Sequence, residues 1–151
     1  MIKLLFLSHP QSSEPPMAYF IMKELVKKAY LESRITMDTA RLTKKGSPLN
    51  DAARAELAVH QIPSDDTIPF ALAWKTYENY DFILTMDNTE ENELFNTIGG
   101  DVDEKIHILS DYAKNHPTIP NPTTGAFWDD VYETSAAGCQ GLLEKLEDWI
   151  R

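Results

Sequence analysis

The chain has 151 residues, of which 42% are hydrophobic and 25% are charged, as in a globular protein with one core. Asp and Glu number 24 against 14 Lys and Arg, which gives a formal net charge of −10. This charge argues against a nucleic acid or an anionic membrane surface as a partner, because both would be repelled. Cys139 is the only cysteine, so an intramolecular disulfide is excluded.

The sequence lacks the features of a signal peptide or a membrane helix. Residues 1–7 are apolar, but no basic region precedes them and no small-residue cleavage site follows. No apolar run approaches the length of a membrane span. We therefore predict a soluble, cytoplasmic protein with a single domain over residues 1–151, no cofactor and no metal needed to hold the fold.

In chain order, the first elements are a strand, a loop and a helix. Residues 2–7 form a nearly continuous apolar run of strand length, which is typical of a buried parallel strand. Residues 8–16 are polar and rich in proline, which predicts a loop. Residues 17–30 carry apolar side chains at helical spacing, and Pro15 and Pro16 suit the start of that helix.

The remaining elements continue this alternation. Further strands are predicted at residues 34–39, 80–86 and 105–109, and further helices at residues 51–60, 88–98 and 128–151. Gly99 and Gly100 follow the third helix, as glycine often does at a helix C-terminus. A proline-rich loop over residues 115–125 precedes the last helix, in which Gly138 and Gly141 are minor interruptions.

This order of elements predicts an α/β fold, a doubly wound four-stranded parallel sheet with helices on both faces. Ligands bind such sheets beyond the carboxyl ends of the strands. The loop that follows the first strand, residues 8–16, is therefore the expected functional site.

Several local strings, in their order and spacing, resemble the low-molecular-weight protein tyrosine phosphatases. They are the opening strand at 2–7, residues 16–18 at the first helix, 81–87 in the third strand, 119–122, and 136–143 in the last helix. The resemblance covers nearly the whole chain and implies the fold described above.

The resemblance also implies where a catalytic site would lie. In that family a C-x5-R-S loop follows the first strand, and an aspartate in a later D-P loop protonates the leaving group. On this chain the cysteine position is Ser8, the arginine position is Glu14, the following serine is Pro15, and the aspartate position is Asn121.

These replacements remove the family's chemistry, so no catalytic residue of the family kind is expected. The Ser8 hydroxyl is almost wholly protonated near neutral pH without a base to activate it. Glu14 would repel a phosphate by about 4 kcal/mol per unit charge at ~4 Å and an effective dielectric constant near 20. Asn121 has no proton to donate to a leaving group. Pro10 removes an N–H group from the loop and fixes its φ angle.

The histidines allow an alternative that the pattern does not favour. Ser8 and His9 could be a nucleophile and its base, but adjacent residues that leave a strand usually point to opposite sides. His9 is therefore predicted to be a loop or surface histidine. His60, His107 and His116 lack metal-ligand spacing, so no metal site is expected.

Other candidate residues have simple structural interpretations. Cys139 is predicted to be a buried apolar side chain of the last helix. Asp87 could be a polar group of the cleft, but a charge at a helix N-terminus is the simpler interpretation. The acidic residues at 90–93 are interpreted as the solvated first turn of that helix. Trp128 could line a partner site or anchor the last helix in the core. Thr123 and Thr124 replace the aromatic pair that the resemblance implies beside the catalytic acid.

The predicted function is therefore that of a catalytically inactive relative, a pseudophosphatase, which binds an unidentified protein or small molecule. The candidate binding residues are Ser8, His9, Gln11, Ser12, Ser13, Glu14, Asn121 and Trp128. One alternative is a divergent phosphatase or other hydrolase that uses different residues in the same cleft. Another is a phosphate sensor without turnover, which Glu14 opposes.

The orientation of Glu14 is a separate prediction. A helix N-terminus favours a nearby carboxylate, so we expect Glu14 to turn back towards the first helix. Its partners there would be the N–H groups of the first turn or the hydroxyls of Ser12 and Ser13. The alternative is that Glu14 points into solvent.

Overall fold

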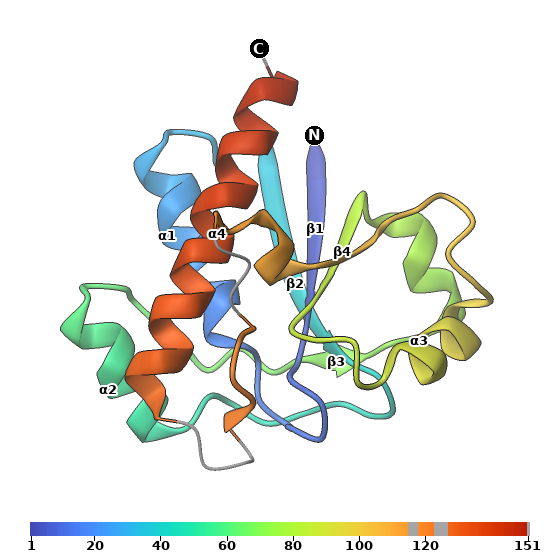
Figure 1. Cartoon of the computed structure of the whole chain (residues 1–151), viewed down its shortest axis with the longest axis horizontal. Helices are drawn as coiled ribbons and strands as arrows, with labels where there is room; N and C mark the ends of the chain where they lie inside the picture. The colour runs from blue at the N-terminus through green and yellow to red at the C-terminus, as the bar shows by residue number, and fades with distance from the viewer. Residues whose placement is uncertain (115–117, 123–126, 151) are drawn as a thin grey trace.

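The chain folds around a five-stranded sheet, seen in a computed structural model that describes residues 1–114, 118–122 and 127–150 (Figure 1). The strands are β1 (Ile2–Leu7), β2 (Ile35–Arg41), β3 (Phe70–Ala71), β4 (Phe82–Thr85) and β5 (Ile106–Ile108). Their order is β3-β2-β1-β4-β5, and every neighbouring pair is parallel. The prediction of an α/β fold with a parallel sheet is confirmed, but the predicted number of four strands was wrong.

The strand that the sequence did not reveal is β3, at one edge of the sheet. Its two residues, Phe70 and Ala71, pair with Ala40 and Arg41 of β2, and both are exposed. Two exposed residues are too few to produce either an alternating or a continuous apolar pattern.

The central strand β1 is buried on both faces. Leu4 and Phe6 join the core on one side of the sheet, whereas Leu5 and Leu7 join the core on the other side. Alternate side chains of a strand point to opposite faces, so an apolar run is what a strand between two helical layers requires.

Helices cover both faces of the sheet. They are α1 (Met17–Lys28), α2 (Asp51–Val59), α3 (Glu91–Ile98) and α4 (Trp128–Ile150), with two short 3₁₀ helices, η1 (Trp74–Asn79) and η2 (Leu109–Tyr112). Side chains of α1, α2 and α4 pack on the Leu4 face, and those of α3 and η1 pack on the Leu5 face (Figure 1). The predicted helices are confirmed, and their described ends either coincide with the predicted ends or are shifted by at most three residues. In the described part of the chain, no helix has the length and apolarity to cross a membrane.

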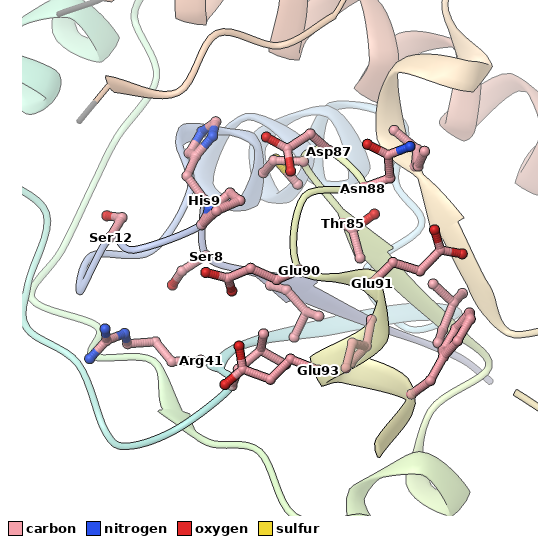
Figure 2. A pocket seen from close by; sticks show the side chains of 18 of the residues that line it. Ser8, His9, Ser12, Arg41, Thr85, Asp87, Asn88, Glu90, Glu91 and Glu93 are labelled. Atoms are coloured by element: carbon pink, nitrogen blue, oxygen red, sulfur yellow. The ribbon is translucent and has the colours of Figure 1, made fainter. Parts of the chain in front are cut away.

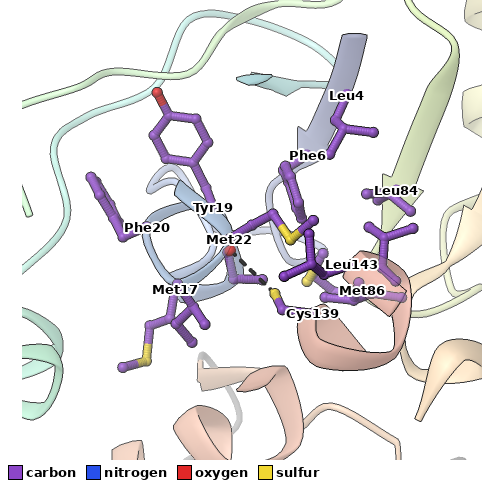
Figure 3. Packing of buried hydrophobic residues seen from close by; sticks show 14 of the residues in the cluster. Leu4, Phe6, Met17, Tyr19, Phe20, Met22, Leu84, Met86, Cys139 and Leu143 are labelled. Atoms are coloured by element: carbon purple, nitrogen blue, oxygen red, sulfur yellow. Dashed lines mark hydrogen bonds between the residues drawn. The ribbon is translucent and has the colours of Figure 1, made fainter. Parts of the chain in front are cut away.

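The main core lies between α1, α4 and the sheet (Figure 3). Gly138 and Gly141, predicted to be minor interruptions of the last helix, do not break α4. They are instead where α4 meets η2. A Cβ atom at position 138 would lie 2.9 Å from the Leu109 carbonyl oxygen, and one at position 141 would overlap the Tyr112 carbonyl.

Candidate functional site

A pocket of about 470 Å³ opens at the carboxyl edge of the sheet (Figure 2). The chain leads from β1 to β2 on one side and later returns to β4 on the other side, so the ends of β1 and β4 form a topological switch point. Ligand sites of open parallel sheets lie at such points. The pocket walls come from residues 7–12, 41–43 and 85–95 and from the region of β5. Residues 8–16, which connect β1 to α1, are called the β1–α1 loop below.

Several backbone N–H groups that could bind a ligand are missing from the β1–α1 loop or are already hydrogen-bonded within it. Pro10 and Pro15 have no N–H group. The Ser12 N–H donates to the His9 carbonyl oxygen at 3.0 Å, and the Glu14 N–H donates to the Ser12 hydroxyl at 3.2 Å. These groups are not available as an open ring of donors around an anion.

A carboxylate from the opposite wall lies close to this loop. Glu90, at the start of α3, points across the pocket (Figure 2), and the backbone of Gln11, a residue with φ 64°, affects its pKa. Burial and the nearby charge of Glu93 raise the pKa of Glu90, while the Gln11 backbone and Arg41 act in the opposite direction. The interpretation of the acidic run as solvated holds for the exposed Glu91 and Glu93 but was wrong for half-buried Glu90.

Glu14 has a different partner from the one predicted. One of its carboxylate oxygens accepts hydrogen bonds from the Asn50 backbone N–H at 2.6 Å and from the Asn50 side-chain amide at 2.7 Å. Asn50 is the N-cap of α2, and its own side-chain oxygen accepts from the Ala53 N–H at 2.8 Å. The carboxylate therefore turns to a helix N-terminus, but to that of α2, which lies beside the loop, and not to that of α1.

Ser13 fixes the same side of the loop. Its carbonyl oxygen accepts from the Ser47 N–H at 2.8 Å, and the two serine hydroxyls are 2.7 Å apart. Gly46 lies so close to the Ser13 carbonyl that a Cβ atom there would overlap it. Gly46 therefore permits the close approach of two backbones, which any larger residue would prevent.

Asn121 fixes the other side. Its side-chain amide donates to the Pro10 carbonyl oxygen at 2.9 Å. The residue at the family's general-acid position thus contacts the β1–α1 loop, as a hydrogen-bond donor. Thr123 and Thr124 lie outside the described residues.

Ser8 and His9 are adjacent in sequence, but their side chains are not hydrogen-bonded to each other. His9 is only 4% exposed, so the prediction of a surface histidine was wrong, although it does lie in a loop. Neither ring nitrogen of His9 nor the Ser8 hydroxyl has a hydrogen-bond partner among the described residues. Burial lowers the pKa of His9 to about 4, against a smaller opposite effect of Asp87. The imidazole is therefore neutral near pH 7.

The charge of the pocket is strongly negative. Arg41 is the only Lys or Arg among the lining residues. The lining carboxylates are Asp87, Glu90, Glu91, Glu93, Asp101 and Asp111. In the described part of the chain, none of the six is within ion-pair distance of a Lys or Arg. The acidic run at the start of α3 was visible in the sequence, but no sequence pattern marked Arg41 as part of this pocket.

Trp128 lies beside a second, smaller pocket of about 140 Å³ that Glu14 and Asn50 also line. It is also partly buried against the main core, as expected for an anchor of the last helix, and its part in binding a partner stays a prediction. Cys139 is fully buried, as predicted; its thiol donates to the Ala18 carbonyl oxygen at 3.4 Å, and burial raises its pKa (Figure 3). The described residues include no group of three or more His, Cys, Asp or Glu placed to hold a metal ion.

Comparisons with known proteins agree on one family. Residues 3–149 match the model of the low molecular weight phosphotyrosine protein phosphatases. The chain is 24% identical over 151 residues to the low molecular weight protein-tyrosine-phosphatase YfkJ of Bacillus subtilis, and the match covers 97% of each chain. The crystal structure of YfkJ superposes with a TM-score of 0.88 at 26% identity, covering 100% of this chain and 98% of the other. A protein tyrosine phosphatase from Entamoeba histolytica has the same fold, with a TM-score of 0.84 at 21% identity and full coverage of both chains.

Proposed function

Because the chain belongs to the low molecular weight phosphotyrosine protein phosphatase family, we propose that it is a catalytically inactive member that acts by binding a partner. The observation that carries this proposal is the pairing of Glu14 with Asn50. The resemblance puts a phosphate-binding arginine at position 14. This chain has a carboxylate there, and its hydrogen bonds to the N-cap of α2 make it part of the fold.

Phosphate binding is opposed by charge. An anion in the β1–α1 loop would meet the carboxylates of Glu14 and Glu90, and each such pair costs about 4 kcal/mol at ~4 Å with an effective dielectric constant near 20. Glu90 also lines the pocket beside this loop, so its charge lies on the path of an approaching anion. Arg41 is the nearest compensating charge in the pocket lining, and it already interacts with Glu90.

Turnover is opposed by the residues at the nucleophile and acid positions. The Ser8 hydroxyl has no base bonded to it among the described residues, so it stays protonated and a poor nucleophile. The Asn121 amide already donates to Pro10 and has no acidic proton for a leaving group.

The test is an assay of p-nitrophenyl phosphate and phosphotyrosine hydrolysis by purified protein. We expect rates indistinguishable from those of the Ser8→Ala variant, because the wild-type hydroxyl takes no part in chemistry. A preparation whose turnover is well above the buffer blank, and whose activity disappears with Ser8→Ala, would show that the proposal is wrong. Activity that survives Ser8→Ala but disappears with Asp87→Asn would indicate a hydrolase with a different residue set in the same cleft.

A further inference from the structure

We propose that the pocket at the switch point between β1 and β4 binds a protonated alkylamine, either a free amine or the end of a lysine side chain. This inference rests on the proposed function, because it names the chemistry of the ligand that the inactive cleft would hold. Where a phosphatase needs a site for an anion, this chain has a site for a cation.

The first argument for an amine ligand is the charge around the pocket. Six carboxylates and one guanidinium line it. Asp101 is engaged by the Tyr77 hydroxyl and by backbone N–H groups, so it is part of the structure. By contrast, the carboxylates of Glu91, Glu93 and Asp111 have no hydrogen-bond partner among the described residues. The pocket therefore attracts a cation and repels a phosphate.

The second argument for an amine ligand is the presence of two polar side chains without hydrogen-bond partners in the described part of the chain. His9, at 4% exposure, and Ser8 both line the pocket, and their side-chain polar atoms have no partner in the described part of the chain. Figure 2 shows His9 and Asp87 at the same end of the pocket, in agreement with the effect of Asp87 on the His9 pKa. A neutral imidazole offers one acceptor nitrogen, and a hydroxyl offers two lone pairs. An ammonium group, with three N–H donors, is suited to such acceptors.

The third argument for an amine ligand is the volume of the pocket together with its apolar lining residues. A volume of about 470 Å³ is suited to a small organic ligand. The apolar side chains of the lining include Leu7, Leu42, Met86, Leu94 and Ile106. They suit the methylene groups of an alkylamine, whereas a hydrated inorganic cation would gain nothing from them. The described carboxylates also do not converge into a metal-binding group.

The test is isothermal titration of the purified protein with 1,4-diaminobutane and, separately, with N-acetyl-lysine methylamide. The pocket variant is Glu90→Gln/Glu93→Gln. Its matched control is Glu32→Gln/Glu144→Gln, which removes the same charge at two exposed positions outside the pocket. We expect at least one of the two amines to bind saturably. The pocket variant should bind about tenfold more weakly, as for the loss of two partly screened charge interactions, and the control should bind like wild type.

The two amines separate the sources of the ligand. Tighter binding of the diamine identifies a free amine, and tighter binding of the lysine derivative identifies a side chain of a partner. If the pocket variant does not fold, Glu91→Gln/Asp111→Asn replaces it, with the same expectation, because both residues are solvent-facing parts of the lining. A second variant, His9→Leu, should also weaken binding severalfold.

Absence of saturable binding by both amines would overturn this inference, as would an equal loss in the pocket and control variants. Either result leaves the proposed lack of catalysis intact, because that is tested by turnover. Conversely, phosphatase turnover would overturn the proposed function even if the amines bind.

Discussion

At the scale of single residues, two of the candidate site residues are hydrogen-bonding parts of the fold. Glu14 bonds to the N-cap of α2, and Asn121 bonds to Pro10. Both side chains are therefore held by contacts within the fold. Mutation of these positions should therefore change stability, which would not be expected for exposed and unused remnants of an active site.

Glu14→Ala should lower the free energy of unfolding by about 1–3 kcal/mol, because the Asn50 N–H groups lose their acceptor in a partly buried place. Urea denaturation followed by circular dichroism measures this change. The matched control is Glu144→Ala, at an exposed site on α4, where the change should stay within about 0.5 kcal/mol. Equal stability of Glu14→Ala and wild type would show that the pairing with Asn50 contributes nothing.

His9 should make the fold sensitive to acid. Its pKa is about 4 in the folded protein against 6.5 ordinarily, so the unfolded chain binds a proton more readily between these values. The free energy of unfolding is therefore unaffected by His9 protonation well above pH 6.5, and it decreases as the pH falls from 6.5 towards 4. Between pH 7.5 and pH 5 this loss amounts to about 2 kcal/mol.

The measurement is urea denaturation of wild type and His9→Leu at both pH values. Other groups also titrate in this range, so the quantity of interest is the difference between the two proteins. Wild type should lose more stability than His9→Leu between pH 7.5 and pH 5. Parallel losses in the two proteins would mean that His9 titrates normally.

At the scale of elements, two close backbone contacts position the parts of the fold. Gly46 lets the segment before α2 approach the β1–α1 loop, and Gly141 lets α4 approach η2. Both contacts bring together segments far apart in sequence, and both depend on the absence of a side chain.

Gly141→Ala should destabilise the protein although alanine is the better helix former by about 1 kcal/mol. The new Cβ atom would overlap the Tyr112 carbonyl, which is backbone and cannot rotate away. We expect a net loss of about 1–3 kcal/mol, typical of overpacking. Gly138→Ala serves as a milder comparison. Its Cβ atom would lie 2.9 Å from Leu109, so the loss of stability should be smaller than for Gly141→Ala. Thermal denaturation of both variants checks the order, and a more stable Gly141→Ala would contradict this account.

At the scale of the whole molecule, the sequence predicted the layered fold and the place of the cleft. The apolar runs of β1 and β4 and the helical periodicities are strong local signals, because both elements are buried. The edge strand β3 produced no such signal, since its two residues are exposed and their partners lie about 30 positions earlier in the chain.

The position of the cleft was predictable from the sequence, but the contacts of its residues were not. The partners of Glu14 and Ser13 lie 36 and 34 residues away, and no local pattern marks Asn50 or Ser47 as neighbours of the loop. His9 was predicted to be a loop or surface histidine from its place after the first strand, yet tertiary packing covers its ring. Contacts between residues far apart in the sequence thus determine the partners of Glu14 and Ser13 and the burial of His9, and sequence periodicity does not reveal such contacts.

The place of β1 at the centre of the sheet has a consequence for synthesis. Its partners are residues 35–40 of β2 and 82–84 of β4, so one neighbour becomes available soon and the other much later. At ~5–20 residues per second, the ribosome needs about 4–16 s to proceed from the end of β1 to the end of β4. During that interval β1 has only one of its two neighbouring strands. The growing chain therefore carries an incomplete apolar strand for seconds, the period in which a chaperone that recognises such segments would engage it.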